Sequence, residues 1–161
     1  MESDHIFYEL FRQRPHWLRQ LTGVPIPENS KGSSQTLKHL EIRFDLVFEP
    51  ADLQEPWYLF EFQLYHDHSI FNRIELARCL LWRESNSRED CRRKSFQPRE
   101  VETAVLFGSR SELPSTHERY PSIRKLFIDE LLVELRKKEP DSPLLAAMSP
   151  LHDELSDLES K

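Results

Sequence analysis

Two strand-like apolar runs, separated by a short polar connection, constrain the fold of this chain more than any other feature. In residues 40–49, LEIRFDLVFE, large apolar residues recur at every second position, so Phe44, Leu46 and Phe48 are expected to share one buried face. Residues 57–65, WYLFEFQLY, are aromatic and almost continuously apolar, which is typical of a central strand covered on both faces. The two runs therefore predict an antiparallel hairpin inside a sheet.

The rest of the chain predicts helices around this hairpin. Apolar spacing, capping residues and chain breakers predict these further elements: helices from Asp4, over 15–23 and over 69–84, strands over 101–107 and 125–129, and a last helix stopped by Pro140. Residues 24–36 hold turn formers without periodicity, and they predict a loop. This order predicts an α/β fold in which helices flank a mixed sheet.

The chain is long enough for one domain with a buried core, since it has 161 residues. We expect that domain over residues 1–139. Residues 140–161 are expected to form a tail that is a marginal helix or disordered, because Pro150 interrupts its coiled-coil-like leucine spacing. An adaptor that associates through this tail is an alternative with little support in the sequence.

Composition limits the environment and the partners of the chain. No apolar run approaches the roughly 18 residues of a membrane span, and the N-terminus lacks the pattern of a secretory signal. Two cysteines without a CxxC motif fit a reducing compartment, so cytoplasmic localisation is expected. The net charge of −6 argues against nonspecific binding to nucleic acid. Residues 83–99, with six basic and three acidic residues, are either a phosphate-binding strip or a solvated loop.

Each strand of the predicted hairpin carries a carboxylate. Folding the hairpin symmetrically about Leu53 places Asp45 opposite Glu61, and directly opposed like charges destabilise a sheet unless something compensates them. Three compensations are open: protonation of one carboxylate, neutralisation by Arg43, or a bridging divalent cation. Gln63 follows on the same face as Glu61, and its amide is able to orient a water or a phosphate oxygen.

These residues carry a family resemblance. RFDLVFEP followed by WYLFEFQ resembles the core motif of the PD-(D/E)xK nucleases. DHIFYELFRQRP, FDLVF…LFEFQLYHD and AVLFGSR are similar to the Rpn-type recombination-promoting nuclease and putative transposase group, above all to a member known as a domain of unknown function. The resemblance covers roughly residues 4–135. It implies a restriction-endonuclease-like mixed sheet and hydrolysis of DNA phosphodiesters that depends on Mg²⁺ or Mn²⁺.

The same resemblance implies roles for individual residues. Asp45, Glu61 and the backbone carbonyl of Phe62 would ligate the metal ion. Gln63 occupies the position where the superfamily has a lysine, so it would position the attacking water but would not balance charge. Glu9, with Asp4 as the second choice, matches a further carboxylate that the superfamily often takes from its first helix. Because of Gln63, an inactive nuclease-fold protein that binds DNA or a protein partner remains the alternative function.

Further candidates concern partners and other chemistry. The candidates for DNA contact are Arg73, Arg92, Arg93 and Lys94. His66-Asp67-His68 either binds a transition metal or caps the following helix. Cys79 lies in an apolar helix and is expected in the core rather than as a nucleophile. DNA and a second copy of the chain are the expected partners.

Overall fold

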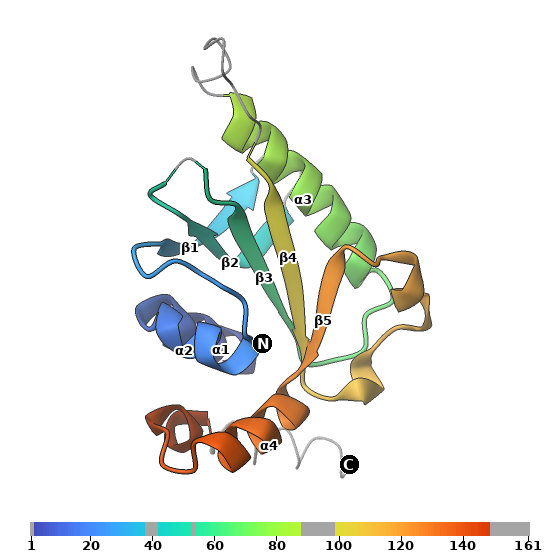
Figure 1. Cartoon of the computed structure of the whole chain (residues 1–161). Helices are drawn as coiled ribbons and strands as arrows, with labels where there is room; N and C mark the ends of the chain where they lie inside the picture. Colours follow the sequence, from blue (N-terminus) through green and yellow to red (C-terminus); the bar gives the residue numbers. More distant parts are fainter. Residues whose placement is uncertain (1, 38–41, 53, 88–98, 149–161) are drawn as a thin grey trace.

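A five-stranded mixed sheet forms the centre of the protein (Figure 1). The computed structural model describes residues 2–37, 42–52, 54–87 and 99–148. The strands, in the same order along the chain and across the sheet, are β1 Lys31–Leu37, β2 Ile42–Glu49, β3 Trp57–Gln63, β4 Val101–Phe107 and β5 Ile123–Phe127. β1, β2 and β3 are antiparallel neighbours, whereas β3, β4 and β5 are parallel.

Helices cover both faces of the sheet (Figure 1). The helices are α1 Glu2–Gln13, α2 Pro15–Thr22, α3 Ile70–Ser87 and α4 Ile128–Lys138, with short 3₁₀ helices η2 Arg110–Glu112 and η3 Ser115–Arg119 between β4 and β5. Side chains of α1, α2 and α4 share one buried cluster with the sheet, and α3 packs in two clusters on the other side. The predicted α/β fold, a mixed sheet with flanking helices, is therefore confirmed.

β3 is the centre of both packing layers, as its sequence predicts. Every residue from Trp57 to Gln63 is buried except the partly exposed Glu61. Tyr58, Phe60 and Phe62 point to the cluster that contains α1 and α2, while Trp57 and Leu59 pack under α3. Alternation along an extended strand thus places Glu61 and Gln63 on the α3 side of the sheet.

The second helix agrees with the prediction, and the start of the first does not. α2 begins at Pro15 and is followed by Gly23, which has φ 69° and donates its N–H to the carbonyl of Arg19. A residue without Cβ adopts this left-handed conformation without strain, so it stops the helix. α1 begins at Glu2. Asp4 therefore lies inside the helix rather than at its cap, and its side chain lies outside the described part of the structure.

The predicted loop over 24–36 is confirmed for residues 24–30, which form no helix or strand, but is wrong from Lys31 onward, because β1 occupies Lys31–Leu37. This strand, KGSSQTL, lacks apolar alternation and lies at the edge of the sheet, where it pairs only with β2. An edge strand is held by main-chain pairing with one neighbour, so it does not need apolar alternation of its own. Hydrogen bonding to β2 outweighs its weak intrinsic preference.

The predicted face of β2 is confirmed for Leu46 and Phe48 and wrong for Phe44. Ser33 pairs with Val47 but Gln35 pairs with Phe44, so β2 has one residue more than β1 between these pairs. This extra residue is a β-bulge, which shifts the alternation of side chains. Phe44 and Val47 consequently share the cluster under α3, while Leu46 and Phe48 lie on the opposite side.

Part of the predicted tail belongs to the core. Residues 143–148 are helical, and Leu144, Leu145 and Met148 are buried in the cluster that contains α1, α2 and α4. Residues 149–161 lie outside the described part of the structure, and the division at residue 139 stays a prediction. Among the described residues, no helix combines the length and the apolar character that crossing a membrane requires.

Candidate functional site

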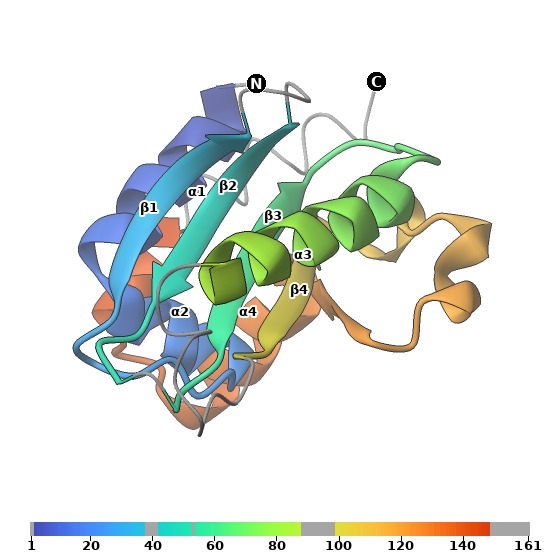
Figure 2. The ribbon, with the colours of Figure 1, turned by 90° about the horizontal axis from the view of Figure 1, so that it is seen from above.

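β2 and β3 separate at the level of the two carboxylates. Their ladder pairs Phe48 with Tyr58, Val47 with Leu59 and Leu46 with Phe60, which is the predicted register that puts Asp45 opposite Glu61. Beyond this point β2 remains paired with β1, and β3 remains paired with β4 to its last residue. The pairing of β2 with β3 therefore ends beside the carboxylates, and α3 crosses this face of the sheet (Figure 2).

The two carboxylates replace the missing ladder bonds. The backbone N–H of Asp45 donates to Oε2 of Glu61 at 3.2 Å, and the backbone N–H of Phe62 donates to Oδ2 of Asp45 at 2.9 Å. Each side chain thus satisfies a buried donor on the strand of the other. The reciprocal bonds hold both carboxylates in the space between the strands.

The carbonyl of Phe62 points to the same space. In an extended strand, the N–H and the C=O of one residue point to the same neighbouring strand. Since the N–H of Phe62 reaches Asp45, its carbonyl also faces β2. Two carboxylates and one backbone carbonyl, all predicted as metal ligands, therefore converge on one side of β3.

A cation from α3 lies beside Glu61. Nη2 of Arg73 is 3.7 Å from Oε1 of Glu61 and 3.5 Å from Oδ2 of Asp67. Partial burial alone would raise the pKa of Asp67, but hydrogen bonds from the amide and hydroxyl of Ser69, together with the charges of Arg73 and His68, outweigh it and lower the pKa. The link through Arg73 joins the start of α3 to the end of β3.

Gln63 lies close to this pair along the chain but is enclosed. Its side chain is 1% exposed, and its amide nitrogen donates to the carbonyl of Tyr65. Its own carbonyl accepts the N–H of Gly108 at 3.3 Å, which ties β3 to the turn after β4. The structure thus buries Gln63 at the end of the strand that carries Glu61.

Glu9 is not brought to the carboxylate pair. Phe7 and Phe11 stack on Phe62 with ring centroids 5.5 and 5.9 Å apart, so they form the inner face of α1. Glu9 lies two residues from each and therefore points to the opposite side of the helix. There its carboxylate accepts from Arg12 at 2.9 Å. α1 supports the site through Phe62 rather than through this acid.

The structure also places the other candidates. His66 and His68 are exposed, with ring centroids 4.3 Å apart. Within the part of the chain that the structure describes, no three His, Cys, Asp or Glu side chains are grouped so that they could hold a metal ion. The prediction that Cys79 lies in the core is wrong, because it is two residues from the buried Ala77 and Leu81 and thus on the outer side of α3. The remaining candidates lie outside the described residues: Arg92, Arg93 and Lys94.

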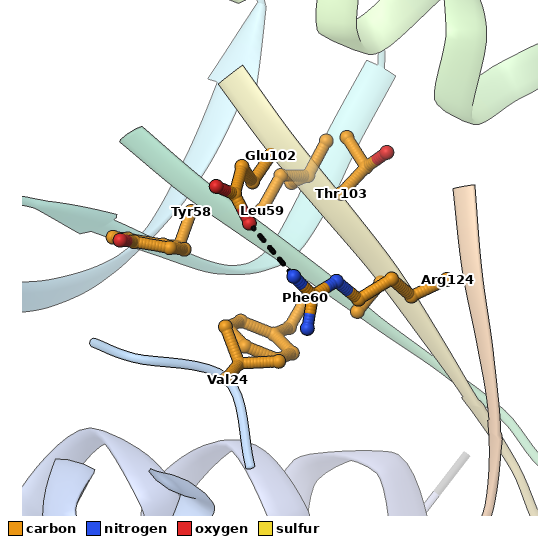
Figure 3. A pocket seen from close by; sticks show the side chains of 8 residues that line it. Val24, Tyr58, Leu59, Phe60, Glu102, Thr103 and Arg124 are labelled. Atoms are coloured by element: carbon orange, nitrogen blue, oxygen red, sulfur yellow. Dashed lines mark hydrogen bonds and ion pairs between the residues drawn. The ribbon is translucent and has the colours of Figure 1, made fainter. Parts of the chain in front are cut away.

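A shallow depression elsewhere on the sheet does not compete with this site. It lies between Val24, in the segment after α2, and the first half of β3, β4 and β5, with Arg124 paired to Glu102 at 3.4 Å across it (Figure 3). It encloses no space that would hold a water molecule, whereas ligand pockets usually measure about 300–1,000 Å³. Burial, with the charge of Glu102, raises the pKa of Tyr58 in its wall, so this hydroxyl is no acid or base near neutral pH.

Comparison with known families places the chain. A family model described as "Protein of unknown function (DUF2887)" matches residues 3–154. The chain belongs to this family. Comparisons with curated proteins and with solved structures gave no match.

The DUF2887 description names no activity, so the geometry of the site carries any functional argument. Within this DUF2887 chain, the contacts of Arg73 with Glu61 and Asp67 are the feature that sequence reasoning missed. Arg73 was expected only as a DNA contact. The signal in the sequence was the position of Asp67 two residues before Ser69. An aspartate at this spacing often accepts a hydrogen bond from the backbone N–H two residues later, and here this bond marks the start of α3.

Proposed function

We propose that this protein is a DNA endonuclease of the PD-(D/E)xK type that depends on Mg²⁺ or Mn²⁺ and belongs to a mobile-element or recombination-promoting system. The observation that carries the proposal is the meeting of Asp45 and Glu61 where β2 and β3 diverge. Each carboxylate is fixed by a backbone N–H from the strand of the other. Two adjacent negative charges on a largely buried surface are costly, and a bound cation would offset that cost.

The donor atoms fit a hard divalent cation. Mg²⁺ is usually bound by one or two protein carboxylates, while waters and substrate phosphates complete an octahedral shell. Asp45 and Glu61 would supply the carboxylates, and Phe62 would supply its backbone carbonyl. No third acidic group joins them among the described residues, which leaves the other positions to water and phosphate oxygens. All these donors are oxygen atoms, as Mg²⁺ and Mn²⁺ prefer.

The residues around the pair have distinct tasks in this proposal. A bound cation would lower the pKa of a coordinated water and offset negative charge on the phosphate. The N–H groups of Asp45 and Phe62 keep the carboxylates oriented without the entropy cost of ordering them at each turnover. Arg73, whose side chain is 45% exposed, is accessible to a phosphate oxygen near Glu61.

A second candidate function follows from Gln63. Its amide is enclosed and bound to a carbonyl, and it carries no charge. These properties suit a structural residue as well as they suit an active site. A nuclease-fold protein without activity that binds DNA or a protein partner is therefore the alternative.

Nicking of supercoiled plasmid DNA tests the proposal. The parent protein is expected to nick with Mg²⁺ or Mn²⁺ and to be inactive with EDTA. Asp45→Asn and Glu61→Gln are each expected to lower the rate by at least about 100-fold, because loss of groups that merely support metal ligands already costs about 10–100-fold. Both amide side chains still accept the backbone hydrogen bonds, so the fold is retained, and circular dichroism verifies this.

Glu9→Gln is the matched control, since it also removes a carboxylate but one on the outer face of α1. It is expected to nick at the parental rate. Absence of nicking by the parent with either metal would refute the nuclease and favour the binding protein. Equal loss of activity in Glu9→Gln would show that the assay reports overall acidity rather than the pair.

A further inference from the structure

Arg73 has an unusual position for a surface cation. It lies in the first turn of α3, where its Nη2 approaches Glu61 and Asp67 at 3.7 and 3.5 Å. The two carboxylates are only 12% and 18% exposed, whereas the Arg73 side chain is 45% exposed. Arg73 is therefore the most solvent-accessible member of this group.

The position of Arg73 is set by the start of α3 rather than by Glu61. Oδ1 of Asp67 accepts the amide and the hydroxyl of Ser69 at 2.8 and 2.7 Å. The carbonyl of Ser69 in turn accepts the backbone N–H of Arg73 at 3.1 Å. Asp67 and the base of the Arg73 side chain are thus held by local bonds that do not involve β3.

The contact between Arg73 and Glu61 is loose. A charge-assisted hydrogen bond measures about 2.7–2.9 Å, and the observed separation is 3.7 Å. An ion pair at this distance with a half-exposed member is weak and easily exchanged. Arg73 therefore offsets part of the negative charge of Glu61 without forming a close hydrogen bond to it.

We propose that Arg73 is an exchangeable counter-ion of Glu61. It competes with the divalent cation for this carboxylate and is released toward a nucleic-acid phosphate when the cation binds. This inference rests on the proposed function. A cation near Glu61 and the guanidinium repel each other, so each weakens the binding of the other. A phosphate that attracts Arg73 removes this repulsion, and by reciprocity the cation then favours phosphate binding.

A Mn²⁺ titration tests the competition without relying on activity. Free Mn²⁺ is followed by electron paramagnetic resonance with the parent chain, Arg73→Gln, Arg73→Lys and, as the matched control, Arg78→Gln. Arg78 lies on the same helix but pairs with Glu75 at 2.8 Å. Arg73→Gln is expected to bind Mn²⁺ about 30-fold more tightly, because a unit charge roughly 4 Å from a divalent ion in a watery environment repels it about twice as strongly as it repels another unit charge.

Arg73→Lys and Arg78→Gln are expected to keep the parental Mn²⁺ affinity, because the positive charge near Glu61 remains. In the plasmid assay, Arg73→Gln is expected to nick more slowly even at saturating Mn²⁺, since the phosphate contact is lost. Tighter Mn²⁺ binding with slower nicking supports the inference.

Unchanged or weaker Mn²⁺ binding in Arg73→Gln would overturn the inference and would leave the nuclease proposal standing if the parent nicks. Tighter binding without nicking by any variant would support the counter-ion and refute the nuclease. Absence of Mn²⁺ binding by the parent would overturn both.

Discussion

At the scale of single residues, the structure resolves how two acids tolerate opposed positions in a sheet. Asp45 and Glu61 do not simply face each other, because each accepts a backbone N–H from the other strand. Such bonds stabilise a carboxylate that would otherwise repel its neighbour. These hydrogen bonds are not among the three compensations predicted from the sequence, which were protonation, neutralisation by Arg43 and a bridging cation. Neutralisation by Arg43, one of those three, concerns a side chain outside the described residues.

Asp67 gives a prediction at the same scale. Its pKa is lowered, so its ionised form stabilises the native state fully above the unfolded pKa of about 3.9, and that contribution disappears as the pH falls through the native pKa. Asp67→Asn is expected to lower the free energy of unfolding by about 1 kcal/mol at pH 7. Urea denaturation between pH 7 and pH 2.5 measures the difference from the parent.

The difference between parent and Asp67→Asn is expected to shrink below about pH 4. Asp52→Asn is the control, because the Asp52 carboxylate also accepts an amide two residues on, from Gln54 at 2.9 Å, but lies on the exposed connection between β2 and β3. A difference for Asp67→Asn that stays constant down to pH 2.5 would contradict an ionic contribution.

At the scale of elements, β1 and the bulge in β2 set the geometry near the site. β1 pairs with β2 through the bulge opposite Ser34, whose hydroxyl donates to the carbonyl of Phe44 at 2.8 Å. The bulge spans Asp45 and Leu46, and Leu46 is also the last residue of β2 in the β2–β3 ladder. Bulges bend a strand and redirect side chains. The polar edge strand therefore contributes to the site without supplying a residue to it.

Gly32 makes this contribution testable. A Cβ at this position would lie 2.8 Å from Cε1 of Phe48 and 3.2 Å from Cδ1 of Leu46, and both side chains belong to the buried cluster that contains α1, α2 and α4. Gly32→Ala is expected to lower the free energy of unfolding by about 1–3 kcal/mol through overpacking. Urea denaturation measures the loss, with Ser33→Ala, on the other side of the strand, as the control. Equal stability of Gly32→Ala and parent would show that β1 does not pack on β2 as described.

At the scale of the whole molecule, the buried cluster that contains α1, α2 and α4 includes side chains from both ends of the described chain. Phe7 and Phe11 near the start, and Leu144 and Met148 near the end, lie in one buried cluster with β3. Phe62 links this cluster to the site, since it stacks on α1 and donates its N–H to Asp45. Damage to this core is therefore expected to affect the spacing of the two carboxylates as well as stability.

Leu144 provides the test at this scale, because it is fully buried in a segment that was predicted as a tail. Leu144→Ala is expected to lower the free energy of unfolding by about 2–5 kcal/mol, the usual cost of a core cavity. Leu76→Ala, at a position 47% exposed on α3, is expected to cost far less. Thermal and urea denaturation compare the two. A loss for Leu144→Ala as small as that for Leu76→Ala would mean that residues 143–148 are not part of the core.

The sequence by itself determined the elements that local patterns specify. The aromatic strand β3 and the limits of α2 at Pro15 and Gly23 follow from side-chain alternation and backbone sterics over a few residues. The register that opposes Asp45 and Glu61 came from assuming a hairpin symmetric about Leu53, and the structure has this register. The acidic pair and Gln63 were therefore visible as candidates before any fold was known.

Only the tertiary structure decided the features that depend on distant partners. β1 is a strand because it pairs with β2. Cys79 is exposed because other faces of α3 meet the sheet. Glu9 lies away from the two carboxylates because Phe7 and Phe11 turn the opposite face of α1 toward Phe62. The contact of Arg73 with Glu61 likewise requires α3 to begin beside the end of β3. Such contacts form between residues that are far apart in the chain, so a local sequence pattern does not predict them.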